Sequence, residues 1–271
     1  MYLSNTGSKD GRAMAEKTEI IAFANQKGGV GKTTCAVNFA ACLGKAGKNT
    51  LLIDFDPQGN ATSALGVSKR NVKISTYDIV AQGADINSAI IKTKFTGLSL
   101  VPANINLAAA EIELSDTSGR EGLLLRAIEQ IRGHYDCIVI DCPPSLGVLT
   151  INALTAASGV IVPMVCEYFA LEGLSQLTFT LERIKKSYNP VLKIHGVMLT
   201  MYDGRLNLTA QVVAELKKHF ADKLFSVAIP RNVRLSEAPS HGQPIIYYDK
   251  FSKGADAFTR VTAEAIGRIW G

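Results

Sequence analysis

The chain has 271 residues, of which 47% are hydrophobic and 20% are charged, and its formal net charge is +5. This composition is typical of an ordinary globular protein whose chain is long enough to bury a sizeable core. The five cysteines are odd in number and form no C-x-x-C pair, which argues against a disulfide framework or a metal cage and predicts reduced, mostly structural thiols.

The N-terminal residues, 1–17, are polar and lack the apolar stretch of a signal peptide. We expect them to form a disordered leader, followed by a single domain over residues 18–271. Met14 is an alternative translation start, and the sequence leaves both Met1 and Met14 open.

Strand and helix signals alternate along the rest of the chain. Apolar runs predict strands at 20–24, 50–54, 98–101, 137–141, 160–165, 194–200 and 225–229. Helical periodicity is clearest at 31–47, 121–132, 171–188, 207–220 and 255–269. The strand runs are continuously apolar, as expected of strands buried on both faces. The predicted fold is α/β, with a doubly wound, mostly parallel central sheet flanked by helices on both sides.

The connection from the first strand to the first helix is the most informative segment. Its eight residues form a glycine-rich turn that ends in lysine and threonine: Lys27, Gly28, Gly29, Val30, Gly31, Lys32, Thr33 and Thr34. Such a turn directs backbone N–H groups at a phosphate, where the helix N-terminus also favours negative charge. Lys32 is predicted to reach the β- and γ-phosphates, and the Thr33 hydroxyl to bind Mg²⁺. The usual P-loop has glycine where this chain has Gln26, and Lys27 is an additional lysine.

Carboxylates follow two of the predicted strands. Asp54 and Asp56 lie at the carboxyl end of strand 50–54, on the same side, where ligands of open α/β sheets bind. Pro57 then turns the chain into a loop, so Asp56 is our candidate for positioning the attacking water. Asp141 ends strand 137–141, just before two prolines, and we expect it to hold Mg²⁺ together with Asp54.

Two further stretches bear on possible partners. Residues 142–166 carry no charge and are long enough to span a bilayer, but their prolines and glycines predict a loop, a short helix near 148–157 and a buried strand instead. Between residues 205 and 260 there are nine Lys and Arg against five Asp and Glu, a surplus of four positive charges. This surplus is compatible either with a solvated surface or with an anionic partner.

Four segments together resemble the ParA (Soj-type) DNA-partitioning ATPases. They are the lysine-bearing P-loop, Asp-Phe-Asp-Pro-Gln-Gly-Asn at 54–60, Asp-Cys-Pro-Pro at 141–144, and Ile-Pro-Arg-Asn-Val-Arg-Leu-Ser-Glu-Ala-Pro-Ser at 229–240. The resemblance extends from residue 18 to the C-terminus, nearly the whole chain. Some of these motifs are shared with the wider deviant-Walker class that includes MinD, whereas residues 230–240 are more particular to the chromosomal partition branch.

The resemblance implies an ATP- and Mg²⁺-dependent switch in which Pro230 and Asn232 join the nucleotide site. It implies an ATP-dependent homodimer, in which Lys27 crosses to the other subunit's phosphates and Glu167 faces the partner. That dimer is expected to bind double-stranded DNA without sequence preference, with Arg234 touching the phosphate backbone. A centromere-binding ParB-type protein is expected to stimulate hydrolysis, and the expected location is the cytoplasm, at the nucleoid.

Two alternative classes stay open. A membrane-cycling division ATPase of the MinD type needs a basic amphipathic C-terminal helix. Here the apolar stripe between residues 261 and 270 is accompanied only by Arg260 and Arg268, so we expect it to pack on the core and expect no membrane partner. A metabolic or iron–sulfur enzyme on the same scaffold needs paired cysteines at a dimer axis, and Cys137 and Cys142 are poorly placed for that role.

Overall fold

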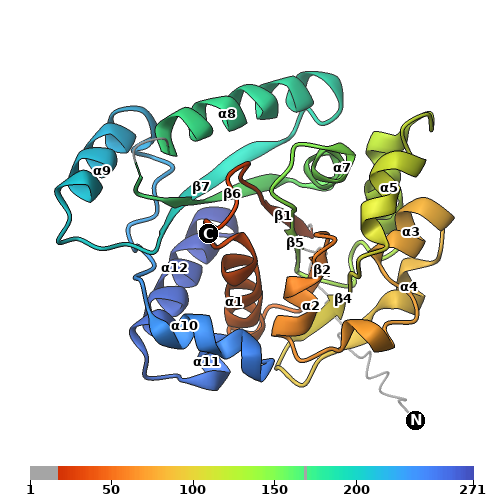
Figure 1. Cartoon of the computed structure of the whole chain (residues 1–271), viewed down its shortest axis with the longest axis horizontal. Helices are drawn as coiled ribbons and strands as arrows, with labels where there is room; N and C mark the ends of the chain where they lie inside the picture. Colours follow the sequence, from red (N-terminus) through yellow and green to blue (C-terminus); the bar gives the residue numbers. More distant parts are fainter. Residues whose placement is uncertain (1–17, 168–169) are drawn as a thin grey trace, which may run out of the picture.

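The computed structural model describes residues 18–167 and 170–271, so the leader predicted at 1–17 and the two alternative starts lie outside the described residues. One sheet runs through the molecule in the order β3-β4-β2-β5-β1-β6-β7 (Figure 1). Its seven strands are β1 Glu19–Phe23, β2 Thr50–Asp54, β3 Ile91–Lys92, β4 Leu98–Val101, β5 Cys137–Asp141, β6 Gly159–Val165 and β7 Lys193–Thr200.

All strand pairs are parallel except β3 with β4, which is antiparallel. The central strands β1, β2 and β5 are almost entirely buried, in agreement with their continuously apolar sequences. This sheet confirms the predicted doubly wound α/β class.

Helices cover both faces of the sheet. The α-helices are α1 Lys32–Lys45, α2 Asn60–Ala64, α3 Thr76–Gln82, α4 Ile86–Ala89, α5 Leu107–Glu113, α6 Leu123–Glu129, α7 Val148–Ala156, α8 Ala170–Ser187, α9 Asn207–Phe220, α10 Val233–Glu237, α11 Ile245–Tyr248 and α12 Lys253–Ile269. Three short 3-10 turns complete the set: η1 Lys69–Asn71, η2 Arg120–Gly122 and η3 Ala238–His241. All the helices predicted from periodicity are present, with ends shifted by a few residues.

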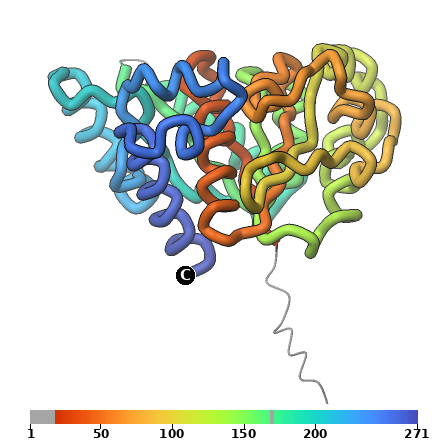
Figure 2. The backbone as a smooth tube through the Cα atoms, turned by 90° about the horizontal axis from the view of Figure 1, so that it is seen from below, coloured from red at the N-terminus to blue at the C-terminus, as the bar shows by residue number. Residues whose placement is uncertain are grey.

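The apolar side chains form two cores, one on each face of the sheet. Alternate residues of β1 belong to different cores, Ile20 and Ala22 to one and Ile21 and Phe23 to the other. The first core lies beneath α3 to α9, and the second beneath α1, α2 and α10 to α12. Figure 2 shows α1 between the C-terminal helices and the segment that follows β2. The helix that follows the P-loop is therefore held from both sides.

The apolar stripe of the C-terminal helix packs on the second core, as expected. Val261 and Ala265 have no exposed surface, and Ile266, Ile269 and Trp270 pack against that core. Among the helices of residues 18–167 and 170–271, none combines the length and apolar composition needed to cross a membrane. The charge-free run 142–166 is a loop, α7 and β6, which confirms its interpretation.

The prediction of a strand at 225–229 is wrong, because the structure has no strand there. This segment pairs with β7 only at its ends, where the Phe225 N–H donates to Val197 O at 3.0 Å and the Ile229 N–H donates to Leu199 O at 2.8 Å. Between them the Ser226 N–H donates instead to the Glu264 carboxylate of α12, at 3.0 Å from the nearer oxygen. The side-chain acceptor interrupts the ladder, so the segment is an irregular edge and not a strand.

Candidate nucleotide-binding site

The loop between β1 and α1 has the backbone geometry of a phosphate cradle. Gly29 and Gly31 have φ values of 74° and 83°, in the left-handed region that glycine tolerates best. Gly31 is the N-cap of α1, and no side chain caps that helix of 14 residues. Its first backbone N–H groups are therefore available to an anion, at the positive end of the helix dipole.

The neighbouring strands fix this loop in place. The Thr200 hydroxyl at the end of β7 donates to the carbonyl of Val30 at 2.8 Å, in a buried hydrogen bond. The Asn25 side chain donates to Pro163 O of β6 at 2.7 Å and accepts from the Lys27 N–H at 3.0 Å. The cradle is therefore held by hydrogen bonds to β6 and β7, between residues that are 138 and 170 positions apart in the chain.

Lys32, at the start of α1, is almost buried, with 6% of its surface exposed. Its ammonium donates to the carbonyl of Lys27 at 3.2 Å, so the side chain folds back across the loop. Burial lowers the pKa of Lys32, and the carboxylate of Asp141 is the largest opposing influence. The structure thus places Lys32 near Asp141, and its contact with the β- and γ-phosphates stays a prediction.

Asp54 and Asp141 are register partners at the ends of β2 and β5, and neither has exposed surface. Burial raises the pKa of Asp54 to about 6 and the pKa of Asp141 well above its usual range, and in each case nearby carboxylates add to the rise. Neither oxygen of Asp141 has a hydrogen-bond partner among the described residues. Two neighbouring buried carboxylates, of which Asp141 has both oxygens without a hydrogen-bond partner among the described residues, fit a divalent cation.

The described residues contain no cluster of three or more His, Cys, Asp or Glu side chains suited to a metal ion. All five cysteines are free, and all but Cys166 are buried, so the iron–sulfur alternative finds no paired thiols. Magnesium does not need such a cluster, because it is usually held by one or two carboxylates together with substrate phosphates. Asp54, Asp141 and the partly buried Thr33 at the start of α1 form that kind of donor set.

Asp56 lies in the loop 55–59, here called the switch loop, and 7% of its surface is exposed. Its carboxylate accepts the Gln58 N–H at 2.9 Å, and its own N–H donates to Asp54 Oδ1 at 3.3 Å. The loop is therefore folded around Asp56 and connected to Asp54. The second carboxylate oxygen of Asp56, Oδ2, accepts no hydrogen bond from the described residues.

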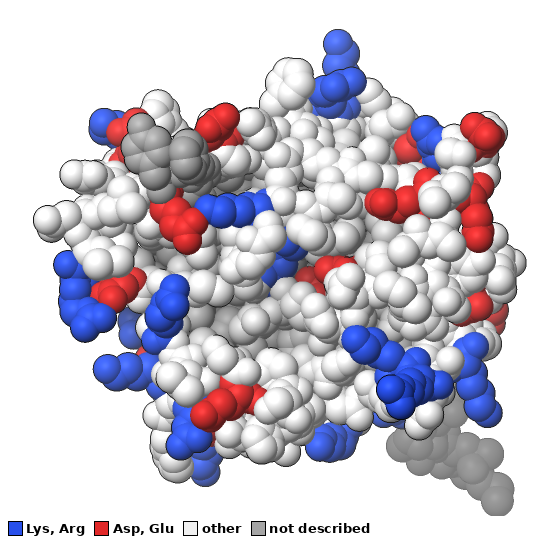
Figure 3. All heavy atoms as spheres, in the orientation of Figure 1, with Lys and Arg blue, Asp and Glu red and all other residues white. Residues whose placement is uncertain are grey.

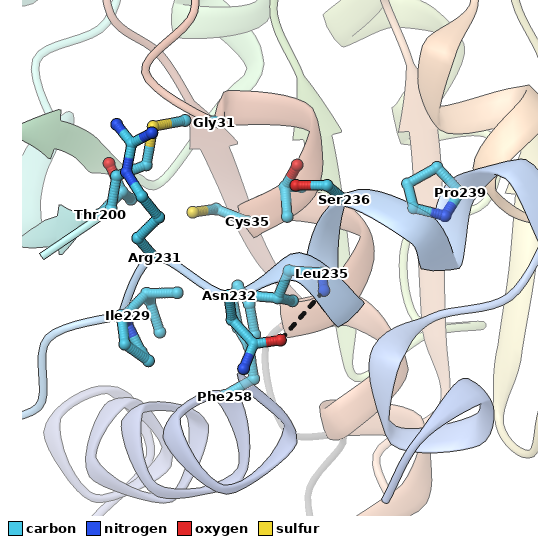
Figure 4. Close-up of a pocket in the computed structure, with 13 residues that line it drawn as sticks. Gly31, Cys35, Thr200, Ile229, Arg231, Asn232, Leu235, Ser236, Pro239 and Phe258 are labelled. Carbon is cyan, nitrogen blue, oxygen red and sulfur yellow. Dashed lines mark hydrogen bonds between the residues drawn. The ribbon is translucent and has the colours of Figure 1, made fainter. Parts of the chain in front are cut away.

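A cavity of about 320 Å³ opens beside the cradle (Figure 4). Pro230 and Asn232 line it together with Gly31 and Thr34, which brings the predicted nucleotide residues of the two segments together. Asn232 also caps α10, since its Oδ1 accepts the Leu235 N–H at 3.3 Å. The volume is at the lower end of the range of small-molecule pockets.

Comparison with known proteins agrees with this geometry. A family model described as an AAA domain matches residues 18–194. The chain is 56% identical over 246 residues to the sporulation initiation inhibitor protein Soj of Bacillus subtilis (strain 168), covering 91% of this chain and 97% of that protein. It is 48% identical over 256 residues to the chromosome partitioning protein ParA of Caulobacter vibrioides (strain NA1000 / CB15N), covering 94% and 96%.

The chain belongs to the Soj/ParA family of chromosome-partitioning ATPases. Among solved structures, it resembles a Mycobacterium smegmatis protein described as cobyrinic acid a,c-diamide synthase with bound ADP and magnesium. The TM-score is 0.81 and the identity 37%, with 93% of this chain and 95% of that chain covered. As a Soj/ParA protein the chain is an ATPase.

Lys27, the additional lysine of this Soj/ParA P-loop, forms an ion pair with Glu167 of its own chain. The two side chains are 39% and 60% exposed, so the pair lies at the surface beside the cradle. The structure thus brings together the two residues expected to act across the subunit boundary, and it pairs them within one protomer.

Arg234 lies outside the catalytic site, on the exposed side of α10. It pairs with Glu237 at 2.9 Å and with Asp249 at 3.5 Å. The hydrogen bond to Glu237 and the charge of that carboxylate raise the pKa of Arg234. Arg234 is thus surface-exposed, as a phosphate contact requires, but it is also neutralised by two acids.

Several residues of the site were not predicted. Thr200 ends β7 at the carboxyl edge of the sheet, and that position is a signal that could have found it. Met201 and Arg231 also line the cavity. Thr62, which contacts Asp54, had no sequence signal, because a threonine in a polar loop is ordinary.

Proposed function

We propose that this Soj/ParA protein is an ATP-operated switch that dimerises with ATP, binds double-stranded DNA without sequence preference, and separates chromosome or plasmid copies. The observation that carries the proposal is the cradle itself, in which Lys32 is buried near Asp141 while Lys27 remains at the surface. One lysine suffices for the phosphates of its own subunit, which leaves Lys27 for those of a second protomer.

ATP would lie with its phosphates over residues 28–34 and its nucleoside toward the cavity beside Pro230 and Asn232. Thr33, Asp54 and Asp141 would hold Mg²⁺, which supplies positive charge to the phosphates when bound. The buried, unpartnered oxygens of Asp141 support this assignment. Lys32 would stabilise the negative charge that develops during phosphoryl transfer.

Asp56 would orient the attacking water, since the switch loop holds its carboxylate at the edge of the site. Loss of the γ-phosphate would remove the group that Lys27 of each protomer shares with the other, and the dimer would separate. Lys27 must leave Glu167 before it reaches a second subunit, so dimer formation competes with this ion pair.

DNA binding would use the basic surface of the C-terminal half. Figure 3 shows basic side chains gathered around α9 to α11, interspersed with acids. Two protomers double the phosphate contacts, so DNA affinity would follow the nucleotide state through avidity. We propose a cytoplasmic, nucleoid-associated protein and a centromere-binding ParB-type partner that stimulates hydrolysis, on the strength of family membership.

The test is binding to random-sequence duplex DNA, measured over a salt series with ATP, with ADP and without nucleotide. We expect binding only with ATP, and a steep loss of affinity as salt rises. The variant Arg234→Glu should weaken binding strongly and flatten the salt dependence, while ATP-dependent dimerisation persists.

Arg132→Glu is the matched control, because Arg132 pairs with Glu129 at 3.0 Å at the same helical spacing as Arg234 with Glu237. An Arg234→Glu dimer that binds DNA like the parent would exclude Arg234 as a contact. A parent protein that binds no DNA with ATP would reject the DNA function itself.

A further inference from the structure

Thr62, on the short helix α2 behind the switch loop, is completely buried, and its backbone N–H and hydroxyl make three hydrogen bonds to Asp54 and Ala103. Its backbone N–H and its hydroxyl both donate to Asp54 Oδ2, each at 2.7 Å. The hydroxyl oxygen also accepts the N–H of Ala103 at 2.9 Å. One hydroxyl thus joins the end of β4 to the carboxylate at the end of β2.

These bonds form a chain that ends at the residue assigned to the attacking water. The Ala103 N–H reaches Thr62, Thr62 reaches Asp54, and Asp54 Oδ1 accepts the N–H of Asp56 at 3.3 Å. All four members are buried, and hydrogen bonds in a buried chain polarise and strengthen one another. The backbone of Asp56 is therefore positioned from β4, two hydrogen bonds beyond Thr62.

The far side of the switch loop is also packed against the end of β4. Gly59 has φ 59°, and a Cβ atom there would lie 2.9 Å from the carbonyl oxygen of Ala103. The Lys69 ammonium donates to the carbonyl of Gln58 at 2.7 Å. With Thr62 on one side and these contacts on the other, Asp56 lies between two anchored points.

We propose that Thr62 is a positioning residue for ATP hydrolysis, which acts by fixing Asp54 and, through it, the backbone of Asp56. The inference rests on the hydrolytic role proposed for Asp56 and is independent of DNA binding. Thr62 is not among the residues that line the cavity, so its loss should spare nucleotide affinity.

The variant Thr62→Val keeps the shape and removes the hydroxyl. It leaves the Ala103 N–H without its acceptor and takes one of two donors from Asp54 Oδ2. Loss of a residue that orients a catalytic group typically costs about 10- to 100-fold in activity, and we expect a loss of that order in kcat. KM and the affinity for a non-hydrolysable ATP analogue should change less than about threefold, since binding contacts remain.

Two comparisons separate this role from a general loss of stability. Thr62→Ser retains the hydroxyl and should restore most of the turnover. Thr76→Val is the control for the substitution itself, because Thr76 is also fully buried and its hydroxyl has no partner among the described residues. That control should leave kcat unchanged.

The measurements are single-turnover hydrolysis at saturating Mg-ATP, analogue binding by fluorescence titration, and thermal unfolding to confirm that each variant is folded. A folded Thr62→Val protein with normal kcat overturns the proposal, as does a lowered kcat that Thr62→Ser fails to restore. If Thr62→Val does not fold, Thr62→Ala and Thr62→Ser, which both lack the γ-methyl group, isolate the hydroxyl. Equal kcat in that pair overturns the proposal.

The same assay includes Asp56→Ala. Normal turnover in that variant shows that the role assigned to Asp56 is wrong, whatever Thr62 does. Because no DNA is present, a failure of the DNA proposal has no effect on this result.

Discussion

At the scale of single residues, the site is defined by negative charge that the chain does not neutralise by itself. Asp54 and Asp141 are register partners at the ends of the neighbouring buried strands β2 and β5, and burial raises the pKa of both. Lys32 is the cation that most directly opposes the rise at Asp141. The carboxylates still lack a balancing positive charge, so this edge of the sheet suits a cation that also binds a phosphate.

Asp56→Ala should produce a protein that binds ATP and dimerises but hydrolyses slowly. The carboxylate that orients water is lost, whereas Lys32 and the cradle are untouched, and removal of such a group typically costs about 100-fold or more in turnover. Light scattering with ATP should show a dimer that persists for much longer than that of the parent. Turnover at the parent rate would move the role elsewhere, with Asp54 the next candidate.

His195, on β7, makes the stability of the fold depend on pH. Burial, together with the charges of Lys193 and Lys223, lowers the pKa of His195 to about 4. The Glu19 carboxylate lies 3.8 Å from Nε2, too far for a hydrogen bond, and Nε2 has no partner among the described residues. Burial is therefore the main cause of the lowered pKa of His195.

In the unfolded chain the pKa of a histidine is about 6.5, so the unfolded state binds the proton more tightly. Stability should fall as the pH is lowered from about 6.5 to about 4, by at most about 1.4 kcal/mol per pH unit from this residue. Urea unfolding at pH 7 and pH 5 measures the loss. His195→Gln should lose less stability than the parent between these values, and an equal loss would assign the effect to other groups.

At the scale of elements, the three glycines of the P-loop differ in whether the backbone conformation requires a glycine. Gly29 and Gly31 have left-handed backbone conformations, so a side chain at either position strains the cradle. Gly28 has no such conformation, and a Cβ atom built there meets nothing within 4 Å. Gly28 is therefore not needed for the fold of the loop within one protomer.

Gly28→Val should bind ATP yet stay monomeric, because the branched side chain occupies the space through which a second cradle approaches. Analogue titration should give an affinity near that of the parent, and light scattering with ATP should give the monomer mass. Gly29→Val is the comparison: with φ 74° at that position, it should impair nucleotide binding as well. An ATP-dependent dimer of Gly28→Val would refute the proposed approach of the two loops.

At the scale of the whole molecule, the question is how a protomer changes from the monomer to the proposed dimer. The described structure places Lys27 on Glu167 of the same chain, on an exposed surface. In the free protomer, Lys27, the lysine proposed to cross to the second subunit, is therefore paired with Glu167. Its contribution is small, since exposed ion pairs are weak and screened by salt.

Glu167→Gln should therefore favour dimerisation with ATP. The released Lys27 no longer has to leave a carboxylate, so the protein concentration for half-dimerisation should fall by about two- to fivefold at low salt, and less at high salt. Sedimentation or light scattering over a dilution series measures this shift. Glu129→Gln, which breaks the Arg132 pair elsewhere on the surface, is the control. Weaker dimerisation of Glu167→Gln would mean that Glu167 instead contacts the partner subunit.

The sequence by itself determined six of the seven strands of the sheet, every helix of nine residues or more that the structure describes, and the segment that forms the cradle. Continuous apolar runs identify buried strands, and the glycine-rich turn identifies the cradle, because both depend on residues that are adjacent in the chain. Asp54 and Asp141 could be assigned because parallel strands bring their carboxyl ends to one edge of the sheet. The short helices between β2 and β4 escaped prediction, since none of them reaches eight residues and they are too short to show periodicity.

Only the tertiary structure decided which distant groups hold these elements in place. The Thr62 hydroxyl meets Asp54 and Ala103, and Thr200 meets Val30, because the sheet order brings together residues up to 170 positions apart. The edge at 225–229 is not a strand, since Glu264 of α12 takes the N–H of Ser226. Buried donors and acceptors take whichever partner the packing brings within reach, and sequence patterns carry no record of that choice.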